Sequence, residues 1–188
     1  SNEKVKIRFF KNYNNIKIIF IGRLVNQKDP MTFVRALNLL KDKINFRSII
    51  IGRGYYYKSL QKFLLNKKLN KKVKIINWQK NPYKYLKSAD LLILTSKYEG
   101  LPNILLEAIS LKKNIISTDC PTGPREILDN GKGGDLFRIG DFQQLSKKII
   151  LFSKNQKNYK DKLKLAYKRL ERFDYNKNLK LYLEEIKS

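Results

Sequence analysis

The segment Asp90–Ile109, DLLILTSKYEGLPNILLEAI, contains a strand, a turn and a helix in direct succession. Its first six residues, DLLILT, contain the short apolar run LLIL, which is typical of a strand buried on both faces. Pro102 fits the first turn of a helix, where a missing backbone N–H costs nothing. We expect this helix to run from Pro102 to about Leu111. The residues predicted on its core face are Leu101, Ile104, Leu105, Ala108 and Ile109.

Strand and helix signals alternate along most of the chain. Further strands are predicted at residues 16–21, 46–51, 72–76, 114–118 and 133–137. Helices are predicted after Asp29, at about 56–69 and 82–88, and over most of 141–187. Short buried strands separated by helices favour an α/β fold with a Rossmann-like, doubly wound parallel sheet flanked by helices. Residues 1–15 are interpreted as a linker, 16–170 as the domain and 171–188 as a final helix.

The charge of the chain is strongly positive. Its 188 residues include 41 Lys and Arg but only 16 Asp and Glu, which gives a formal net charge of +25. Such a charge attracts nucleic acid, anionic lipid or phosphorylated ligands. The lysines are scattered over nearly every segment, and arginines, which read guanine edges, are scarce. We therefore expect a Lys-rich composition rather than a nucleic-acid surface, and an anionic membrane surface stays open as a partner.

The chain contains no His and a single Cys, Cys120. A Ser-His-Asp triad, a His metal site, a zinc site and an internal disulfide are therefore excluded from these residues. We expect Cys120 to be a small buried residue in a protein of a reducing compartment. The apolar runs are too short to span a bilayer and no signal peptide is apparent, so a cytoplasmic location is expected, with peripheral attachment to the inner face of the plasma membrane as an alternative.

Candidate ligand-binding residues follow the predicted strands. In doubly wound sheets, ligands bind beyond the carboxyl ends of the strands. Gly22, Arg23 and Lys28 follow the strand at 16–21, and Gly54 follows the strand at 46–51. Later strand ends supply Trp78, Glu99, Gly100, Leu101 and Pro102. Loops that concentrate glycines, prolines and isolated charges in this way point to a functional site.

The predicted helix after Pro102 offers backbone donors to this edge. The amides of Asn103 and Ile104 have no intrahelical partner and carry the partial positive charge of a helix start, which suits a phosphate or sugar hydroxyls. Glu107 lies on the polar flank of the helix, beside the cleft. Its carboxylate can accept two hydrogen bonds, as in the grip on the vicinal hydroxyls of a ribose.

Glu99, Arg23 and Lys28 complete a binding scheme for one extended ligand. Glu99 would reach hydroxyls at the end opposite the ribose, and the two cations would neutralise a diphosphate between those ends. A structural alternative is that Glu99 and Glu107 are helix-start charges that balance a basic protein.

Four motifs in order resemble the C-terminal domain of the retaining glycosyltransferases of family four (group 1), which have the two-domain GT-B architecture. The motifs are GRLVNQK (22–28), IIGRGYYYKSL (50–60), SADLLILTSKYEGLPNILLEAI (88–109) and IISTDCPTGPREIL (115–128). The resemblance covers residues 16–142, and its most specific mark is the E-x7-E spacing of Glu99 and Glu107. Trp78 departs from the family, which commonly has Gly there, and Arg53 replaces a more typical acid.

The resemblance implies a site for a nucleotide-diphosphate sugar. Arg23 and Lys28 match the diphosphate-binding pair, Glu99 the contact to the donor sugar, and Glu107 the contact to the ribose. Residues 100–104 match the loop around the distal phosphate, and residues 77–83 match the base-binding region. Trp78 could stack on the base, although core or rim packing is the favoured interpretation. Arg125 and Glu126 are expected to form a local ion pair.

The resemblance also implies partners beyond this chain. The acceptor, a glycan or lipid of cell-surface polysaccharide synthesis, would bind a separate N-terminal domain, toward which the helix from about Glu171 would cross back. The expected donor is a UDP-, GDP- or ADP-sugar, with no cofactor and no metal, and these residues alone would bind donor without transferring sugar. Alternatives are a noncatalytic basic module for nucleic acid or anionic membrane, and a phosphorylase or epimerase on the same fold.

Overall fold

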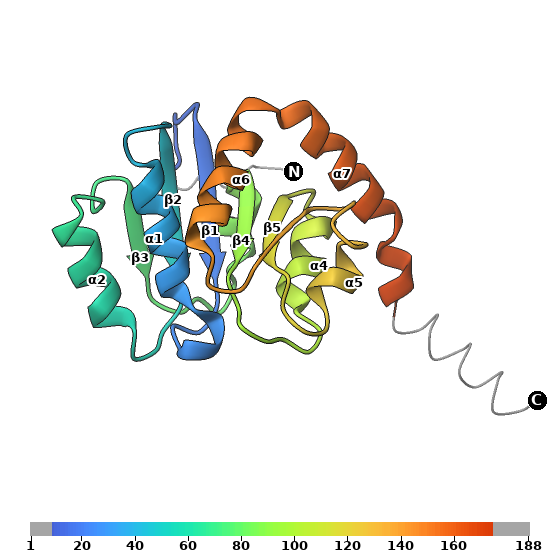
Figure 1. The fold of residues 1–188 in the computed structure, drawn as a ribbon, viewed down its shortest axis with the longest axis horizontal. Coiled ribbons are helices and arrows are strands. Elements are labelled where there is room, and N and C mark those ends of the chain that lie inside the picture. The colour runs from blue at the N-terminus through green and yellow to red at the C-terminus, as the bar shows by residue number, and fades with distance from the viewer. Residues whose placement is uncertain (1–8, 175–188) are drawn as a thin grey trace, which may run out of the picture.

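The computed structural model describes residues 9–174 of the 188-residue chain, and within them it has one parallel sheet between two layers of helices (Figure 1). The six strands lie in the order β3-β2-β1-β4-β5-β6. Their bounds are β1 Ile16–Ile21, β2 Phe46–Ile51, β3 Val73–Ile76, β4 Leu91–Leu94, β5 Asn114–Thr118 and β6 Asp135–Phe137. All five strand pairings are parallel, so the predicted doubly wound sheet is confirmed.

Helices cover both faces of this sheet. Their bounds are α1 Pro30–Leu40, α2 Tyr57–Asn66, α3 Tyr83–Ser88, α4 Asn103–Ser110, α5 Pro124–Ile127, α6 Phe142–Lys154 and α7 Gln156–Lys168, with 3-10 turns η1 Asn26–Lys28 and η2 Leu170–Phe173. One apolar core joins α1, α2 and α6 to the sheet, and a second joins α3, α4, α5 and α7 to its other face. Alternate residues of β1 and β2 enter opposite cores, which is why the C-terminal halves of these strands are continuous apolar runs.

The strand order reverses between β1 and β4, which lie side by side although β2 and β3 separate them in sequence. Chains that leave neighbouring strands in opposite directions open a crevice at the carboxyl edge of a doubly wound sheet. The loops after β1 and β4 therefore meet at this edge. Asp29 starts α1 there by accepting a hydrogen bond from Thr32 N at 3.2 Å, which fixes the end of the β1 loop.

A buried charge cluster ties β6 to the last two long helices. Asp135, on β6, accepts hydrogen bonds from Tyr159 and Lys162 of α7, and Lys148 of α6 lies 3.7 Å from its carboxylate. Burial acts to raise the pKa of Asp135, but these hydrogen bonds and the two lysine charges outweigh it and hold the pKa below the usual range. The cluster fixes α6 and α7 against the sheet edge.

The structure corrects two predictions about individual residues. Leu101 is 52% exposed rather than part of the core, because α4 begins only at Asn103. Arg125 pairs with Asp119, not with Glu126, and its Nε donates to Asp119 Oδ1 at 2.9 Å. The predicted burial of Cys120 is confirmed.

The two ends of the chain fall partly outside the described residues. Most of the predicted helix over 171–188 lies beyond residue 174, and residues 1–8 of the predicted linker are likewise not described. The adjoining Phe9 and Phe10 pack on the domain, and Arg47 Nη1 donates to Phe9 O at 2.7 Å.

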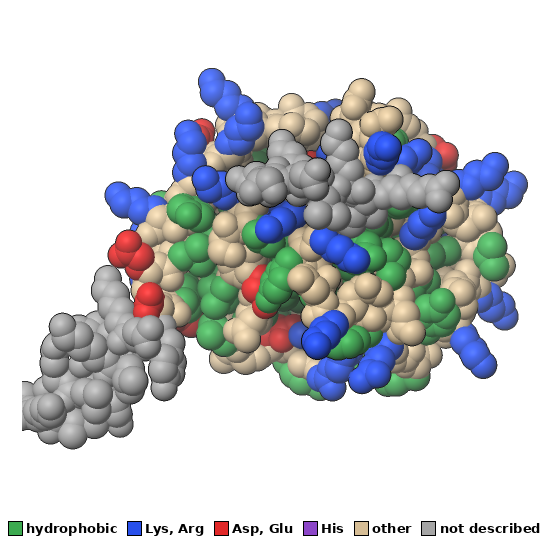
Figure 2. Space-filling view, turned by 180° about the vertical axis from the view of Figure 1, so that it is seen from behind, with side chains coloured by type: hydrophobic (Ala, Val, Ile, Leu, Met, Phe, Trp, Pro, Cys, Tyr) green, Lys and Arg blue, Asp and Glu red, His purple; other side chains and the backbone are tan. Residues whose placement is uncertain are grey.

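Lys and Arg side chains are spread over the surface rather than gathered in one stripe, as the face in Figure 2 shows. Exposed apolar side chains lie between them on the same face (Figure 2). This distribution agrees with the interpretation that the charge of +25 is a matter of composition. None of the helices in residues 9–174 combines the length and the apolar character needed to cross a membrane.

Candidate functional site

Lys28 and Glu99 form an ion pair where the loops after β1 and β4 meet. Ser96 Oγ donates to the same carboxylate oxygen, Oε1 of Glu99, at 2.5 Å. The side chains of Lys28 and Glu99 are 18% and 7% exposed, so the pair is mostly shielded from solvent. The structure therefore brings together two predicted site residues that are 71 positions apart in sequence.

Thr95 fixes the backbone on the lysine side of this pair. Its hydroxyl lies 2.8 Å from the carbonyl oxygen of Lys28 and 2.9 Å from that of Asp29. Because Thr95 directly follows β4, this contact holds the β1 loop against the neighbouring strand end. The position of the Lys28 side chain is thus set by the sheet rather than by a free loop.

Arg23 reaches the same junction through Gln27. Its Nη2 donates to Gln27 Oε1 at 2.9 Å, and Gln27 Nε2 donates to the carbonyl oxygen of Tyr98 at 3.2 Å. Lys97 N also donates to the carbonyl oxygen of Gln27, at 2.8 Å. Arg23 remains exposed, so its guanidinium is available at the rim of the junction.

The predicted glycines bring the loops after β1 and β2 into backbone contact. Gly54 has φ +151°, and a Cβ there would lie 2.3 Å from the carbonyl oxygen of Leu24. Leu24 N donates to Arg53 O at 2.8 Å, and Tyr56 N donates to Leu24 O at 3.0 Å. Gly22 lies beside the Lys28 side chain, where a Cβ would be 3.7 Å from Lys28 Cδ. Gly54 therefore supports the site by close packing.

The start of α4 forms another side of the junction. Pro102 occupies its N-cap position, and no side chain within the described residues caps the helix. The amides of Asn103 and Ile104 are therefore left to solvent or a ligand. Gly100 has open space around it, whereas a Cβ on Gly123, from the loop after β5, would lie 2.2 Å from Gly100 O. Thr122 also donates its hydroxyl to the carbonyl oxygen of Glu99.

Glu107 lies one turn further along α4 and is paired with Tyr83. The hydroxyl of Tyr83, at the start of α3, donates to Glu107 Oε1 at 3.2 Å. The negative charge of Glu107, together with this hydrogen bond, raises the pKa of Tyr83. The two side chains are on the rim, with Tyr83 41% exposed, so a ligand can reach the Glu107 carboxylate.

Trp78 lies on the surface after β3 and is 57% exposed. Of the expected core or rim packing, the core position is therefore excluded, and the residue lies at the surface. The guanidinium carbon of Arg53 lies 5.8 Å from the centroid of its ring, within reach of a cation–π contact. Arg53 is exposed, as expected, and the pair presents a flat cationic surface at the end of the crevice.

Sequence reasoning missed four side chains that hold the predicted ones. They are Ser96 on Glu99, Gln27 on Arg23, Thr122 on the Glu99 backbone and Tyr83 on Glu107. The Ser-x-x-Glu spacing of Ser96 and Glu99 was a local signal, but Tyr83 and Glu107 are 24 positions apart and meet only in the fold. Residues 9–174 hold no group of three or more His, Cys, Asp or Glu that could bind a metal ion.

This arrangement can bind an anion flanked by hydroxyl groups. Lys28, Arg23 and the amides at the start of α4 supply positive charge and donors, and Glu99 and Glu107 supply acceptors. Both cations come from the loop after β1, Glu99 comes from the loop after β4, and Glu107 lies on α4. The structure brings Lys28 and Glu99 into contact at this edge, and the binding role of each residue stays a prediction.

Comparisons with known proteins identify the relatives of this chain. It is 40% identical to an uncharacterized glycosyltransferase of Methanocaldococcus jannaschii over 134 residues, which are 68% of this chain and 32% of that protein. It is 35% identical to the lipopolysaccharide 1,6-galactosyltransferase of Salmonella typhimurium over 126 residues, 65% of this chain and 35% of that protein. The crystal structure of Anabaena HepE in complex with UDP superposes with a TM-score of 0.83 at 20% identity, covering 93% of this chain and 49% of the other.

The chain spans about a third of the length of these two curated relatives. The family model of the group 1 glycosyl transferases matches residues 1–169, which is most of the chain. The fold, the order of the motifs and this match lead to one conclusion: the chain belongs to the group 1 glycosyl transferases.

Proposed function

We propose that this chain is the donor-binding domain of a retaining glycosyltransferase, and that its carboxyl edge binds a nucleotide-diphosphate sugar. The observation that carries the proposal is the mostly buried Lys28–Glu99 pair at the point where the strand order reverses. Lys28 and Arg23 would bind the diphosphate, Glu99 the sugar and Glu107 the ribose. UDP in the structurally similar HepE supports a nucleotide at this kind of fold.

The same groups account for catalysis by charge stabilisation. As the glycosidic bond of the donor lengthens, the diphosphate leaving group gathers negative charge. Lys28, Arg23 and the amides of Asn103 and Ile104 would stabilise that charge, and these protein cations would serve in place of a divalent metal or cofactor. Loss of one such contact typically costs a factor on the order of 10²–10³ in rate.

The acceptor is proposed from the relatives. The name of the Salmonella relative specifies transfer of galactose in lipopolysaccharide. We propose a glycan or lipid acceptor of cell-surface polysaccharide synthesis, bound by a further domain, on the cytoplasmic side of the membrane. These 188 residues alone would then bind donor and transfer no sugar. Product formation by this chain with a UDP-, GDP- or ADP-sugar and a glycan acceptor would contradict that part of the proposal.

Calorimetry on the 188-residue chain tests the donor site. UDP, GDP and ADP are titrated separately into the wild type, Lys28→Ala, Arg23→Ala and the control Lys147→Ala. Lys147 is exposed on α6, outside the described contacts of the site, and its removal changes the net charge equally. We expect one nucleotide to bind the wild type and the control alike, with at least tenfold weaker binding to Lys28→Ala.

Two outcomes would contradict the donor site. One is unchanged affinity in both site variants, and the other is equal loss in Lys147→Ala, since diffuse charge would then explain the binding. If DNA or anionic vesicles bind tightly at low salt while no nucleotide competes, the noncatalytic basic module becomes the better description.

A further inference from the structure

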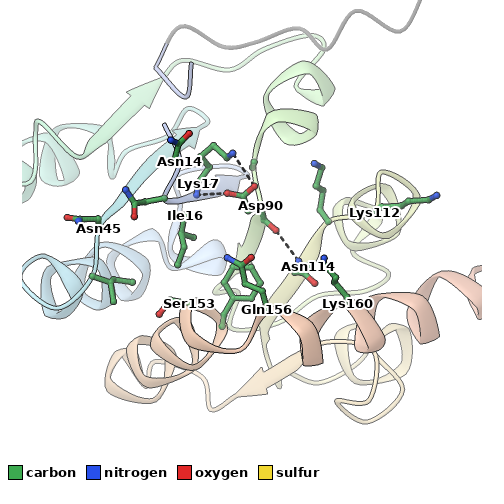
Figure 3. Close-up of a pocket in the computed structure, with 15 residues that line it drawn as sticks. Asn14, Ile16, Lys17, Asn45, Asp90, Lys112, Asn114, Ser153, Gln156 and Lys160 are labelled. Atoms are coloured by element: carbon green, nitrogen blue, oxygen red, sulfur yellow. Dashed lines mark hydrogen bonds and ion pairs between the residues drawn. The ribbon is translucent and has the colours of Figure 1, made fainter. Parts of the chain in front are cut away.

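The last turns of α1, α2 and α6, with the residues that follow them, form one surface at the edge of the sheet opposite the proposed donor site. α1 packs between α2 and α6 (Figure 1). A cavity of about 510 Å³ at this amino edge, where β1, β4 and β5 begin, is lined both by Asn45, after α1, and by Ser153 and Gln156, at the end of α6 and the start of α7 (Figure 3). Lys72, after α2, donates to the carbonyl oxygen of Lys41, after α1. The three helix ends are therefore neighbours, and we call residues 39–45, 65–72 and 151–157 the helix-end surface.

Acidic residues are almost missing from this layer of helices. Residues 30–45, 57–72 and 142–157, which contain the three helices and the turns after them, hold thirteen Lys and Arg and one acidic residue, Asp42. The whole chain holds 41 and 16. On the other face of the sheet, α4, α5 and α7 each include an acidic residue. The lysines are thus spread over the molecule as its composition dictates, and it is the lack of acids that makes this layer positive throughout.

Two leucines lie among these cations with their side chains in solvent. Leu65, in the last turn of α2, is 61% exposed, and Leu151, in the last turn of α6, is 57% exposed. Exposed lysines lie three or four positions away, Lys62 for Leu65 and both Lys147 and Lys154 for Leu151, so leucine and ammonium groups share one face of each helix. A hollow of about 200 Å³ beside Leu65 is lined mostly by aliphatic side chains of α2 and β3. Lysines at helix ends complement the helix dipole, but that role calls for no exposed leucine beside them.

We propose that the helix-end surface binds an anionic lipid bilayer, with its lysines at the lipid phosphates and with Leu65 and Leu151 at the boundary of the acyl chains. Lysine suits this position because its long aliphatic stem can lie along apolar groups while the ammonium group stays at the head groups. Each lysine near an anionic leaflet adds to the attraction, and no acid other than Asp42 opposes it on this layer within the described residues. The carboxyl edge then faces away from the bilayer, where a soluble nucleotide can reach it.

Nucleic acid fits the same surface less well. Twelve of the thirteen cations of the layer are lysines, whereas arginine is the residue that reads base edges. The three segments, all within the described residues, have no exposed aromatic ring on which a base could stack. Exposed leucines gain nothing from a phosphate backbone, but they gain free energy when a membrane buries them.

Binding of the 188-residue chain to phosphatidylcholine vesicles that contain phosphatidylglycerol, measured by co-sedimentation at physiological salt, tests the charge of the surface. The variant Lys67→Gln/Lys154→Gln removes two exposed lysines beside the leucines. The control Lys164→Gln/Lys168→Gln removes the same charge from exposed positions in the C-terminal half of α7. A lysine close to an anionic leaflet contributes about fivefold to binding, so we expect at least tenfold weaker binding of the first variant and little change in the control.

Substitution of the two leucines separates a bilayer from other polyanions. Leu65→Ser/Leu151→Ser keeps every charge and removes the apolar groups that a membrane would bury, so vesicle binding should weaken several-fold. Ile139→Ser is the control, because Ile139 is 42% exposed in the loop after β6, at the carboxyl edge, and it should bind as the wild type does. All three side chains are exposed, so we expect the midpoint of thermal unfolding to change little.

Three results would overturn the proposal. They are the absence of vesicle binding by the wild type, equal weakening in the lysine variant and its control, and vesicle binding that does not depend on the leucines. If duplex DNA then binds the wild type and the leucine variant alike but the lysine variant more weakly, the surface is one for nucleic acid. The donor site is judged by its own nucleotide titrations, which the lysine and leucine variants should leave unchanged because their residues lie at the opposite edge. Vesicle binding through this surface thus stands whether or not the donor site does.

Discussion

Single side chains at the carboxyl edge differ in the protein partners that they already have. Glu99 is held by Lys28 and Ser96 in a mostly buried position, whereas the carboxylate of Glu107 has only the exposed hydroxyl of Tyr83 as a partner within residues 9–174. The first carboxylate is therefore fixed before any ligand arrives. The second can turn toward a ligand at little cost, which suits contact with a flexible ribose.

Substitution of Glu107 should change the titration of Tyr83. The pKa of Tyr83 is raised mainly by the negative charge of Glu107, so Glu107→Gln should lower it toward the ordinary value. Ring-carbon NMR of the tyrosines against pH measures this, with the exposed Tyr55 as an internal control. A Tyr83 titration that is identical in both proteins would show that the contact does not persist in solution.

Glu107 should also matter for the nucleoside part of the donor. Glu107→Ala removes the acceptor proposed for the ribose hydroxyls, and we expect roughly tenfold weaker UDP binding from one lost charged hydrogen bond. Calorimetry with UDP and with inorganic diphosphate separates the effects, since diphosphate should bind both proteins alike. Equal UDP affinities would remove the ribose role.

The meeting of Glu99, Lys28 and Arg23 at one edge of the sheet was predictable from the sequence. Glu99, Lys28 and Arg23 follow strand ends, and a parallel sheet brings such ends to one edge. Trp78 lies at the surface rather than in the core because it follows β3, an edge strand with a neighbouring strand on one side alone. The predicted ion pair of Arg125 with Glu126 was wrong. Asp119 and Glu126 are both near Arg125 in sequence, and the backbone conformation decides which carboxylate the guanidinium reaches.

At the scale of elements, two sets of close contacts connect loops and helices to the sheet. One is the charge cluster of Asp135, which joins β6 to α6 and α7. The other is the contact of Gly123 with the loop around Gly100, which connects the chain after β5 to the start of α4. Both depend on residues distant in sequence, so neither was open to prediction, although the strands and helices that they join were predicted within a few residues.

Loss of the Asp135 charge should destabilise the fold. Asp135→Asn leaves buried partners without their acceptor and should lower the free energy of unfolding by about 2–4 kcal/mol at pH 7. Because the folded pKa of Asp135 is depressed, its stabilisation is present above the unfolded pKa and is lost as pH falls through the folded pKa. Asp135→Asn should therefore lose less stability than the wild type between pH 5 and pH 2.

Urea unfolding across this pH range is the measurement. Asp161→Asn serves as the control, because Asp161 is exposed on α7 and its nearest cation, Lys164, lies 3.4 Å away on the surface. We expect the control to change the free energy of unfolding by less than about 0.5 kcal/mol. An equal effect of the two substitutions would mean that the cluster is not a stabilising element.

Substitution of Gly123, with Gly100 as the control position, tests the contact between the two loops. Gly123 has φ +78° and no room for a Cβ, so Gly123→Ala should cost about 1–3 kcal/mol and disturb the start of α4. Gly100 has open space, so Gly100→Ala should leave the free energy of unfolding within about 0.5 kcal/mol. Thermal unfolding of both variants tests this, and the reverse order of stabilities would contradict the described loop contact.

For the whole molecule, the net charge of +25 is the dominant property. Self-repulsion among spread lysines opposes the compact state, and salt screens it over about 8–10 Å at physiological strength. We therefore expect the midpoint of thermal unfolding to rise by about 2–5 °C between 20 mM and 300 mM NaCl. A midpoint that falls with salt would mean that favourable ion pairs, rather than repulsion, dominate the charge balance.

The architecture was predictable at this scale because apolar runs followed by Gly, Pro or turn residues recur through the chain. Six short apolar runs separated by helices permit few arrangements other than a doubly wound sheet. The cavity at the amino edge was not predictable. Its lining combines side chains from the starts of three strands with a helix that comes much later, and no motif marks such residues in the sequence.

The Lys28–Glu99 pair has a consequence for discrimination among anions in a very basic protein. A phosphate that approaches Lys28 must separate it from a carboxylate that already satisfies its charge. An inorganic ion has no hydroxyl donor for Glu99, so nothing offsets the free energy lost when the ion pair is separated. A molecule that brings hydroxyl donors together with its phosphate would supply a new partner to each side, so we expect the pair to discriminate against simple anions.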